Sequence, residues 1–211
     1  KEVFEYGKLN NSSVNQVIHF AGLKSISDSI KQPNLYWDVN VKGSINLFEV
    51  MDEYDCKKIV FSSSANVYGH SKNSYISEFD KLNPLNPYAE TKVEIEKLLK
   101  KIQKENSSWR VLNLRYFNPI GAHDSGILGE DPLLETNNLF PLILKVASGK
   151  KNKLTIFGDD WQTKDGTCIR DFIHVMDLAD AHIRGLDFLN CDDNSGIRSI
   201  NIGTGIGTSV L

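Results

Sequence analysis

Short apolar runs that alternate with segments of helical periodicity most limit the fold of this 211-residue chain. The runs are apolar throughout, which is typical of parallel strands that are covered on both faces. The expected strands are 16–20, 58–63, 110–116, 154–157, 171–175 and 199–203. The expected helices cover about 25–31, 34–51, 87–105, 138–149 and 176–189. This order predicts an α/β fold with a doubly wound parallel sheet, whose ligands bind at the carboxyl ends of the strands.

Charge, apolar run length and cysteine placement argue against several classes of protein. The net charge is −3 without a basic stripe, so we expect no nucleic-acid partner. The apolar stretches are too short to span a bilayer, so we expect no membrane partner. The cysteines Cys56, Cys168 and Cys191 are scattered, which fits a reduced, cytoplasmic protein better than a disulfide scaffold. The chain has no CxxC, HxH or HExxH motif, so we expect no metal site.

A tyrosine four residues before a lysine is a candidate catalytic pair. The chain has three such pairs: Tyr54/Lys58, Tyr68/Lys72 and Tyr88/Lys92. The first straddles the end of a helix, and the second falls in a loop. For the third, Asn86 is a suitable N-cap and Pro87 suits the first helical position, so Tyr88 and Lys92 lie one helical turn apart.

Two polar residues fall on helix faces that should point inward. Lys92 shares its face with Tyr88, Ile95 and Leu99, so its charge needs a partner or access to water. It either extends to solvent at the end of the helix or forms a functional pair with the tyrosine. Asn40 lies on the inner face of helix 34–51, as a hydrogen-bonded core amide or as a functional group.

Several motifs in a fixed order identify a family. They are "VIHFAGLK" (17–24), "FSSSANVYG" (61–69), "PYAETK" (87–92), "LRYFNPIGAH" (114–123), "GEDP" (129–132), "NNL" (137–139), "IFGDD" (156–160), "DGTCIRDFIHVMDLA" (165–179) and "NIGTGIGTSV" (201–210). Together they resemble the UDP-glucose 4-epimerase family of the extended short-chain dehydrogenase/reductase superfamily. The resemblance covers nearly the whole chain from Val14 onward.

The resemblance implies site residues by position. The implied catalytic residues are Tyr88, Lys92 and Ser64. The implied NAD-binding residues are Phe20, Ala21, Gly22, Leu23, Lys24, Asn40, Ser64, Tyr88, Lys92 and Phe117. The implied substrate-binding residues are Lys24, Ser64, Tyr88, Tyr116, Asn118, Asn138, Leu139, Thr155, Phe157 and Arg170. From the residues alone, Phe157 could equally be core, and Arg170 could pair with Asp171.

The resemblance also implies a reaction and a domain arrangement. A tyrosinate at Tyr88 would take the proton of the sugar 4-hydroxyl while the C4 hydride moves to NAD, which interconverts UDP-glucose and UDP-galactose. Lys92 is expected to lower the pKa of that phenol. Residues 1–120 would form part of a Rossmann-like NAD-binding domain and 121–211 part of a nucleotide-sugar region. Strand 171–175 and helix 176–189 would return to the main sheet. A homodimer is implied as well.

The chain departs from the family pattern in one important way. It has no Gly-rich dinucleotide fingerprint, and "VIHFAG" corresponds to the family's fourth strand, so we expect N-terminal strands and a C-terminal segment to be missing. Residues 1–15 would then be the end of a helix and its loop. The "GTGIG" at 203–207 is expected to be a turn that leads to a helix cap at Thr208 or Ser209. The isolated chain is expected to be inactive.

Two other functions remain open. A nucleotide-sugar 4,6-dehydratase shares the scaffold, but that family carries an Asp-Glu pair where Ser64 is here followed by Ala65 and Asn66. A non-catalytic, dinucleotide-sensing relative would not need the Ser64, Tyr88 and Lys92 set. A serine hydrolase is disfavoured, because the chain lacks a GxSxG motif.

Overall fold

The computed structural model describes residues 1–71, 75–130, 138–191 and 196–211. The chain divides into two compact units. Unit 1 comprises Lys1–Tyr116 with Ala181–Ile202, and unit 2 comprises Phe117–Asp180 with Gly203–Leu211. Parts of "GEDP" and of "NNL", and Lys72 of the second tyrosine–lysine pair, lie outside the described residues. Each unit is described by itself.

A four-stranded parallel sheet forms the centre of unit 1. Its order is β1-β2-β3-β6, with bounds Val17–His19, Lys58–Ser62, Arg110–Tyr116 and Gly196–Ile202. All three neighbouring pairs are parallel. The sequence predicts each of these strands to within about three residues, since long apolar runs are the most reliable strand signal. Because the strands are parallel, their carboxyl ends meet along one edge.

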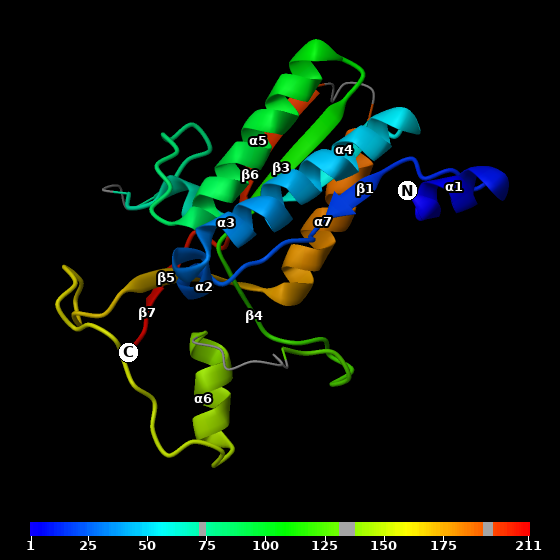
Figure 1. Cartoon of the computed structure of the whole chain (residues 1–211). Coiled ribbons are helices and arrows are strands. Elements are labelled where there is room, and N and C mark those ends of the chain that lie inside the picture. The colour runs from blue at the N-terminus through cyan, green and yellow to red at the C-terminus, as the bar shows by residue number, and fades with distance from the viewer. Residues whose placement is uncertain (72–74, 131–137, 192–195) are drawn as a thin grey trace. The chain divides into compact units, whose positions relative to one another are not determined.

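Helices cover both faces of this sheet (Figure 1). On one face, α4 (Gly43–Glu53) and α5 (Pro87–Glu105) bury apolar side chains against β2 and β3. The core of that face includes Phe48, Met51, Ile59, Phe61, Ile95, Leu99, Trp109 and Val111. The part of α7 (Val175–Asn190) that belongs to unit 1 packs Leu186 and Leu189 on the other face, near Val60 and Leu112. The doubly wound prediction is therefore confirmed.

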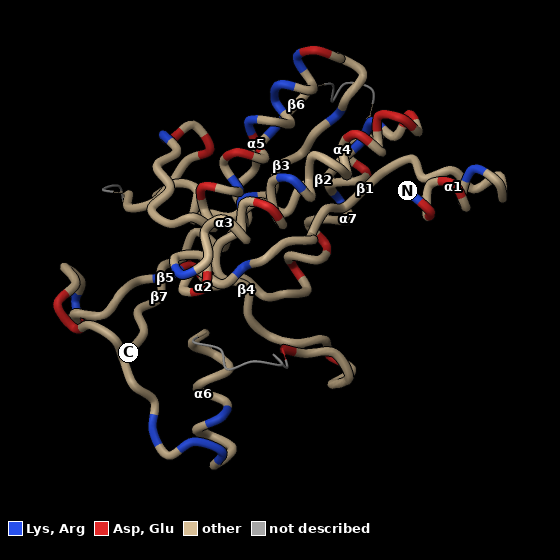
Figure 2. Tube along the Cα trace, viewed as in Figure 1, with Lys and Arg blue, Asp and Glu red and all other residues tan. Residues whose placement is uncertain are grey.

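The first helices carry the expected boundary signals. Helix α2 (Ile26–Lys31) begins after Ser25, whose hydroxyl accepts the N–H of Asp28. The expected helix 34–51 consists of α3 (Pro33–Tyr36), a π-helical segment, η1 (Trp37–Lys42), and α4. In α5, Asn86 Oδ1 accepts the N–H of Ala89 at 2.9 Å, which confirms this N-cap. Acidic and basic residues are interspersed along α5, whereas the charged residues of α4 are all acidic (Figure 2).

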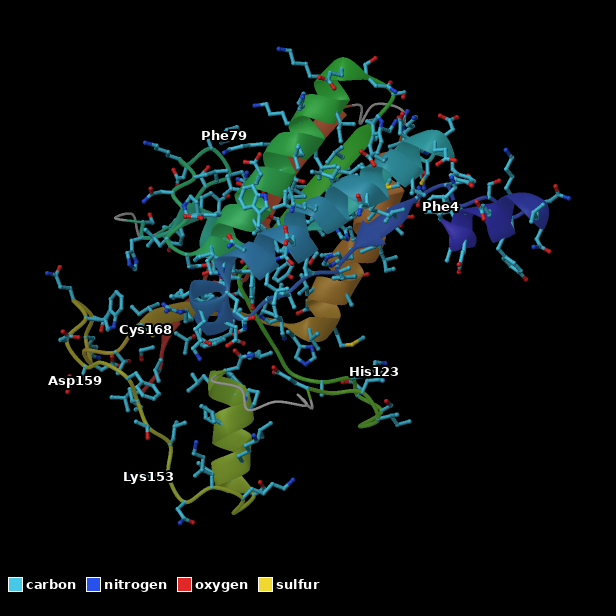
Figure 3. All side chains as sticks on the ribbon, viewed as in Figure 1. Phe4, Phe79, His123, Lys153, Asp159 and Cys168 are labelled. Atoms are coloured by element: carbon cyan, nitrogen blue, oxygen red, sulfur yellow. The ribbon has the colours of Figure 1, made fainter. Side chains whose placement is uncertain are left out.

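The N-terminal helix α1 (Glu2–Leu9) packs through Phe4, which is labelled in Figure 3. The Phe4 ring lies 5.6 Å from that of Tyr54, measured between ring centroids. The chain then reaches β1 through an irregular stretch. A helix followed by a loop within 1–15 is thus confirmed.

Unit 2 contains a small three-stranded sheet of order β4-β5-β7 and helix α6 (Leu139–Ala147). The strands are Asn118–Ile120, Ile169–His174 and Gly207–Ser209. The expectation that strand 171–175 returns to the main sheet was wrong, because β5 pairs in parallel with β4 and antiparallel with β7. Asp171 reinforces that pairing, because it accepts the N–H groups of Thr204 and Gly205, each at 2.9 Å.

Two further expectations about unit 2 were also wrong. Residues 154–157 form no strand, and their side chains are mostly exposed, since a short apolar run without a pairing partner does not specify a strand. The "GTGIG" segment does form a turn. However, Thr208 and Ser209 continue into β7 instead of capping a helix. Within the described residues, no helix is both long and apolar enough to cross a membrane.

Candidate active site

Tyr88 is the second residue of α5, and its side chain is buried at 6% exposure. Burial raises the pKa of its phenol above the usual value, and the phenols of Tyr116 and Tyr36 raise it further. A hydrogen bond with Ser64 acts in the opposite direction. The expectation of a depressed phenol pKa was therefore wrong for this structure, because desolvation outweighs the hydrogen bond with Ser64.

Lys92 lies one turn further along α5 and is 5% exposed. Its Nζ donates a hydrogen bond to the carbonyl oxygen of Ser62 at 2.8 Å and lies 4.9 Å from the ring centroid of Phe61. The distance from Nζ to the ring centroid of Tyr88 is 5.8 Å. Burial lowers the pKa of this lysine to about 8, and the Glu96 carboxylate opposes that shift. Lys92 therefore does not extend to solvent, and its ammonium group lies beside the ring of Tyr88.

Ser64 follows the end of β2 and is buried. Its hydroxyl caps the short 3₁₀ turn η2 (Ala65–Tyr68) and accepts the N–H of Asn66 at 3.2 Å and its side-chain amide at 3.1 Å. A serine at a strand end often has only this turn role. Here the same hydroxyl also interacts with the phenol of Tyr88 and acts to lower its pKa. Ser64 thus joins the turn to the phenol, and a substrate hydroxyl could approach both groups together.

The segment after β1 is the candidate cofactor loop, Phe20–Lys24. All of its residues are exposed except the half-buried Leu23. Gly22 has φ +153°, and a Cβ there would lie 3.0 Å from Oδ1 of Asn40. That position therefore favours glycine, and the bare backbone is left open to a ligand.

The side chain of Asn40 bonds this loop to helix α5. Its Oδ1 accepts the N–H of Leu23 at 2.7 Å, and its Nδ2 donates to the carbonyl oxygen of Leu23 at 3.0 Å. The same Nδ2 donates to Thr91 Oγ1 at 3.1 Å, and that hydroxyl donates to the carbonyl oxygen of Tyr88 at 2.7 Å. Asn40 is thus a satisfied core amide that also connects the candidate cofactor loop to helix α5. Its place in a π-helical segment accords with the frequent occurrence of such segments at functional sites.

Three residues of this region were not predicted from the sequence. Thr91 completes the connection to Tyr88, and Ser62 Oγ lies 2.8 Å from the hydroxyl of the substrate candidate Tyr116. His19, at the end of β1, contacts Ser44 Oγ at 2.8 Å, and that hydroxyl donates to the carbonyl oxygen of Asn40. A polar residue on an otherwise apolar strand was the available signal for His19.

The remaining candidates lie in unit 2. Asn118 and Arg170 are exposed on the paired strands β4 and β5, and Phe117 is half-buried. Arg170 donates to the carbonyl oxygen of Ile169 at 2.8 Å, and no ion pair joins it to Asp171, although both residues are described. The alternative of a salt bridge there is therefore not supported.

The other unit 2 candidates lie before β5. Phe157 is 80% exposed, so the core interpretation of this side chain was wrong. Thr155 is exposed too. Asn138 precedes α6 and donates to the Glu130 carboxylate at 3.0 Å, and Leu139 begins the helix. Together these exposed groups give unit 2 a set of side chains that a ligand can reach.

Residues 7–203 match the model of the NAD dependent epimerase/dehydratase family. The chain is 52% identical over 195 residues to UDP-glucose 4-epimerase 2 of Oryza sativa subsp. japonica, covering 92% of this chain and 48% of the relative. It is 50% identical over 202 residues to UDP-glucose 4-epimerase of Pisum sativum, covering 96% of this chain and 58% of the relative. The chain therefore spans about half the length of the curated relatives it matches.

Solved structures are similar as well. The UDP-glucose 4-epimerase from Bifidobacterium longum in complex with NAD+ and UDP matches with a TM-score of 0.90 and 42% identity, over 100% of this chain and 62% of that one. The enzyme from Stenotrophomonas maltophila, with bound NAD and formylated UDP-arabinopyranose, matches with a TM-score of 0.91 and 41% identity, over 97% of this chain and 60% of that one.

Proposed function

Because the chain belongs to the NAD dependent epimerase/dehydratase family, we propose that the full-length protein interconverts UDP-glucose and UDP-galactose, with NAD as its cofactor. The observation that carries this proposal is the buried cluster of Tyr88, Ser64 and Lys92 at the carboxyl edge of the sheet. The curated relatives with about 50% identity support the choice of substrate.

The residues around this cluster fit a dinucleotide. The glycine at position 22 leaves backbone exposed where a Cβ would meet Asn40, and the exposed Phe20, Ala21 and Lys24 flank it. Lys92 adds a positive charge beside the phenol. We propose that these groups hold the ribose and phosphates of NAD. The chemistry that NAD supplies when bound is reversible acceptance of a hydride from C4 of the sugar.

The side chains would manage the proton of the 4-hydroxyl. Tyr88 is placed to accept that proton, and Ser64, which already bonds the phenol, is placed to bond the reacting oxygen. The ammonium of Lys92 stabilises the phenolate electrostatically. Because Tyr88 and Lys92 are buried, water is kept from the reacting atoms and this interaction is screened less than at a surface.

The rival 4,6-dehydratase reaction needs further acid and base groups next to the serine. Here Ser64 is followed by Ala65 and by Asn66, whose backbone N–H and side-chain amide both bond the serine oxygen. Neither side chain can act as a general acid or base. This arrangement favours epimerisation over loss of water.

Product analysis of the full-length protein tests this proposal. With UDP-galactose as the substrate, we expect UDP-glucose of unchanged mass, identified by NMR and mass spectrometry. A product that has lost one water molecule would show that the protein is a dehydratase instead of an epimerase. The absence of any product, although NAD binds, would favour the non-catalytic, dinucleotide-sensing alternative.

Two expectations about the cellular form belong to the same proposal. We propose a cytoplasmic protein of galactose metabolism that forms a homodimer. Cell fractionation and light scattering of the full-length protein test these two points separately from the reaction.

A further inference from the structure

Helix α5 contacts the serine-rich end of β2 at three successive turns. The first two turns carry Tyr88 and Lys92, whose contacts with the segment 62–64 are described above. One turn later, the Glu96 carboxylate accepts a hydrogen bond from Ser63 Oγ at 2.6 Å. Positions separated by four residues share one face of a helix, so one face of α5 contacts all three residues of the segment 62–64.

The Glu96 carboxylate is itself held from a third element. Arg115, on β3, donates from Nε to Oε1 at 2.9 Å and from Nη2 to Oε2 at 2.6 Å. Both side chains of this ion pair are 7% exposed. Arg115 also donates to the Tyr68 hydroxyl at 2.9 Å and to the carbonyl oxygen of Glu78 at 3.2 Å. A bidentate, charge-assisted hydrogen bond of this kind fixes the orientation of the two side chains as well as contributing energy.

A buried ion pair is weak evidence for stability, because desolvation of the charges opposes their attraction. The Glu96–Arg115 pair is therefore more informative about how side chains are positioned than about the stability of the fold. Ser63 is fully buried, and its own N–H donates to the carbonyl oxygen of Leu114 at 2.9 Å. The backbone N–H of Ser63 is thus bonded to β3, and its side-chain hydroxyl is bonded to α5. Its two chain neighbours are the residues that contact Lys92 and Tyr88.

We propose that Ser63 and Glu96 are positioning residues, which hold Ser64 against the phenol of Tyr88 and the Ser62 carbonyl against Lys92. This inference rests on the proposed function. Neither residue touches the reacting atoms. They act through their neighbours, and a displacement of about 1 Å in a catalytic group can slow a reaction by about 100-fold.

The decisive variant is Ser63→Ala, because it removes one hydroxyl and leaves the Glu96–Arg115 pair in place. Glu96→Gln is less suitable, since it leaves the buried charge of Arg115 without a carboxylate and is expected to destabilise the fold. Ser29→Ala is a matched control. Ser29 is also fully buried, and its hydroxyl donates a single hydrogen bond, to the carbonyl oxygen of Ile26 at 2.7 Å.

The experiment compares the full-length wild type, Ser63→Ala and Ser29→Ala. The readouts are the single-turnover appearance of NADH absorbance with UDP-galactose, KM, the unfolding midpoint and hydrogen exchange of segment 61–67. For Ser63→Ala we expect hydride transfer slowed about tenfold or more, an unchanged KM and faster exchange in that segment. For Ser29→Ala we expect only a lower unfolding midpoint.

Three outcomes would contradict the inference: an unchanged transfer rate in Ser63→Ala, an equal loss in both variants, or exchange in segment 61–67 that does not change. A wild-type protein that forms no NADH would refute the proposed function instead. In that case, the exchange data alone would decide whether Ser63 fixes the segment.

Discussion

The ammonium group of Lys92 lies 2.8 Å from the carbonyl oxygen of Ser62, with both residues in the protein interior. This contact joins helix α5, which carries the proposed catalytic residues, to the end of strand β2. It also explains how a lysine can be buried on the inner face of a helix, because the charge keeps a strong acceptor.

Replacement of Lys92 by Met should shift the pH–rate profile of sugar oxidation upward. At about 6 Å and an effective dielectric constant of about 20, the attraction between ammonium and phenolate is roughly 2.8 kcal/mol, or about two pKa units. We expect an upward shift of about one unit or more, and slower turnover at neutral pH. Pre-steady-state NADH absorbance across pH measures it.

The matched control for this change is Lys97→Met, which removes an exposed lysine of the same helix. It should leave the profile unchanged. An unshifted profile in Lys92→Met would mean that this lysine only holds the cofactor.

Acidification should destabilise the protein through His19. Burial lowers the pKa of this imidazole from 6.5 to about 4, and the nearby charge of Lys92 contributes in the same direction. Between these two pH values the unfolded state binds more protons than the folded state. Stability is therefore fully present above pH 6.5 and is lost as the pH falls through about 4. The full loss corresponds to roughly 3 kcal/mol.

Urea unfolding of the wild type and of His19→Gln across this pH window tests the prediction. The variant should show a smaller decline in the free energy of unfolding. His123→Gln, at an exposed position, should behave like the wild type. Equal slopes in all three proteins would show that His19 does not carry the effect.

Removal of the Asn40 amide should affect both stability and cofactor affinity. Asn40→Ala leaves the N–H and C=O groups of Leu23 without their partner, at a cost of about 1–3 kcal/mol. The cofactor loop should then loosen and bind NAD more weakly. Thermal unfolding and calorimetric titration of NAD into the full-length protein measure the two effects. Asn34→Ala, at an exposed position on α3, serves as the control, and matching affinities for NAD would rule out the loop role.

The 211-residue chain alone should bind NAD poorly. It contains no Gly-rich turn followed by a helix N-terminus, which is the main anchor for a pyrophosphate. Calorimetry should therefore show affinity for NAD only in the full-length protein. Micromolar affinity in the 211-residue chain would contradict this expectation.

Local patterns in the sequence predicted most of unit 1. Its strands are continuous apolar runs, and Asn86 and Pro87 mark the start of α5. The inward positions of Lys92 and Asn40 followed from helical periodicity, and the roles proposed for both rest on the family motifs. Unit 2 was harder to predict, because β5 gains its partners from segments more than 30 residues away, as its contact between Asp171 and Gly205 illustrates.

Contacts between segments that are far apart in the chain could not be predicted from the sequence. Nothing in the spacing of Ser63, Glu96 and Arg115 reveals that they meet, since each comes from a different element. The raised pKa of Tyr88 was missed for a related reason. Helical periodicity shows that Tyr88 points inward, but how completely its phenol is buried depends on how α5 packs. The size of the desolvation effect on its pKa therefore could not be predicted from the sequence.

The measurement that tests the central claim most directly is a single turnover of the full-length protein with UDP-galactose, followed by NADH absorbance, in the wild type and in Tyr88→Phe. Tyr88→Phe removes one buried hydroxyl and keeps the ring, so the fold should persist. We predict a transient rise of NADH in the wild type and none in the variant, with both proteins equally folded by circular dichroism. A wild-type rate in Tyr88→Phe would contradict the claim that this phenol is the base.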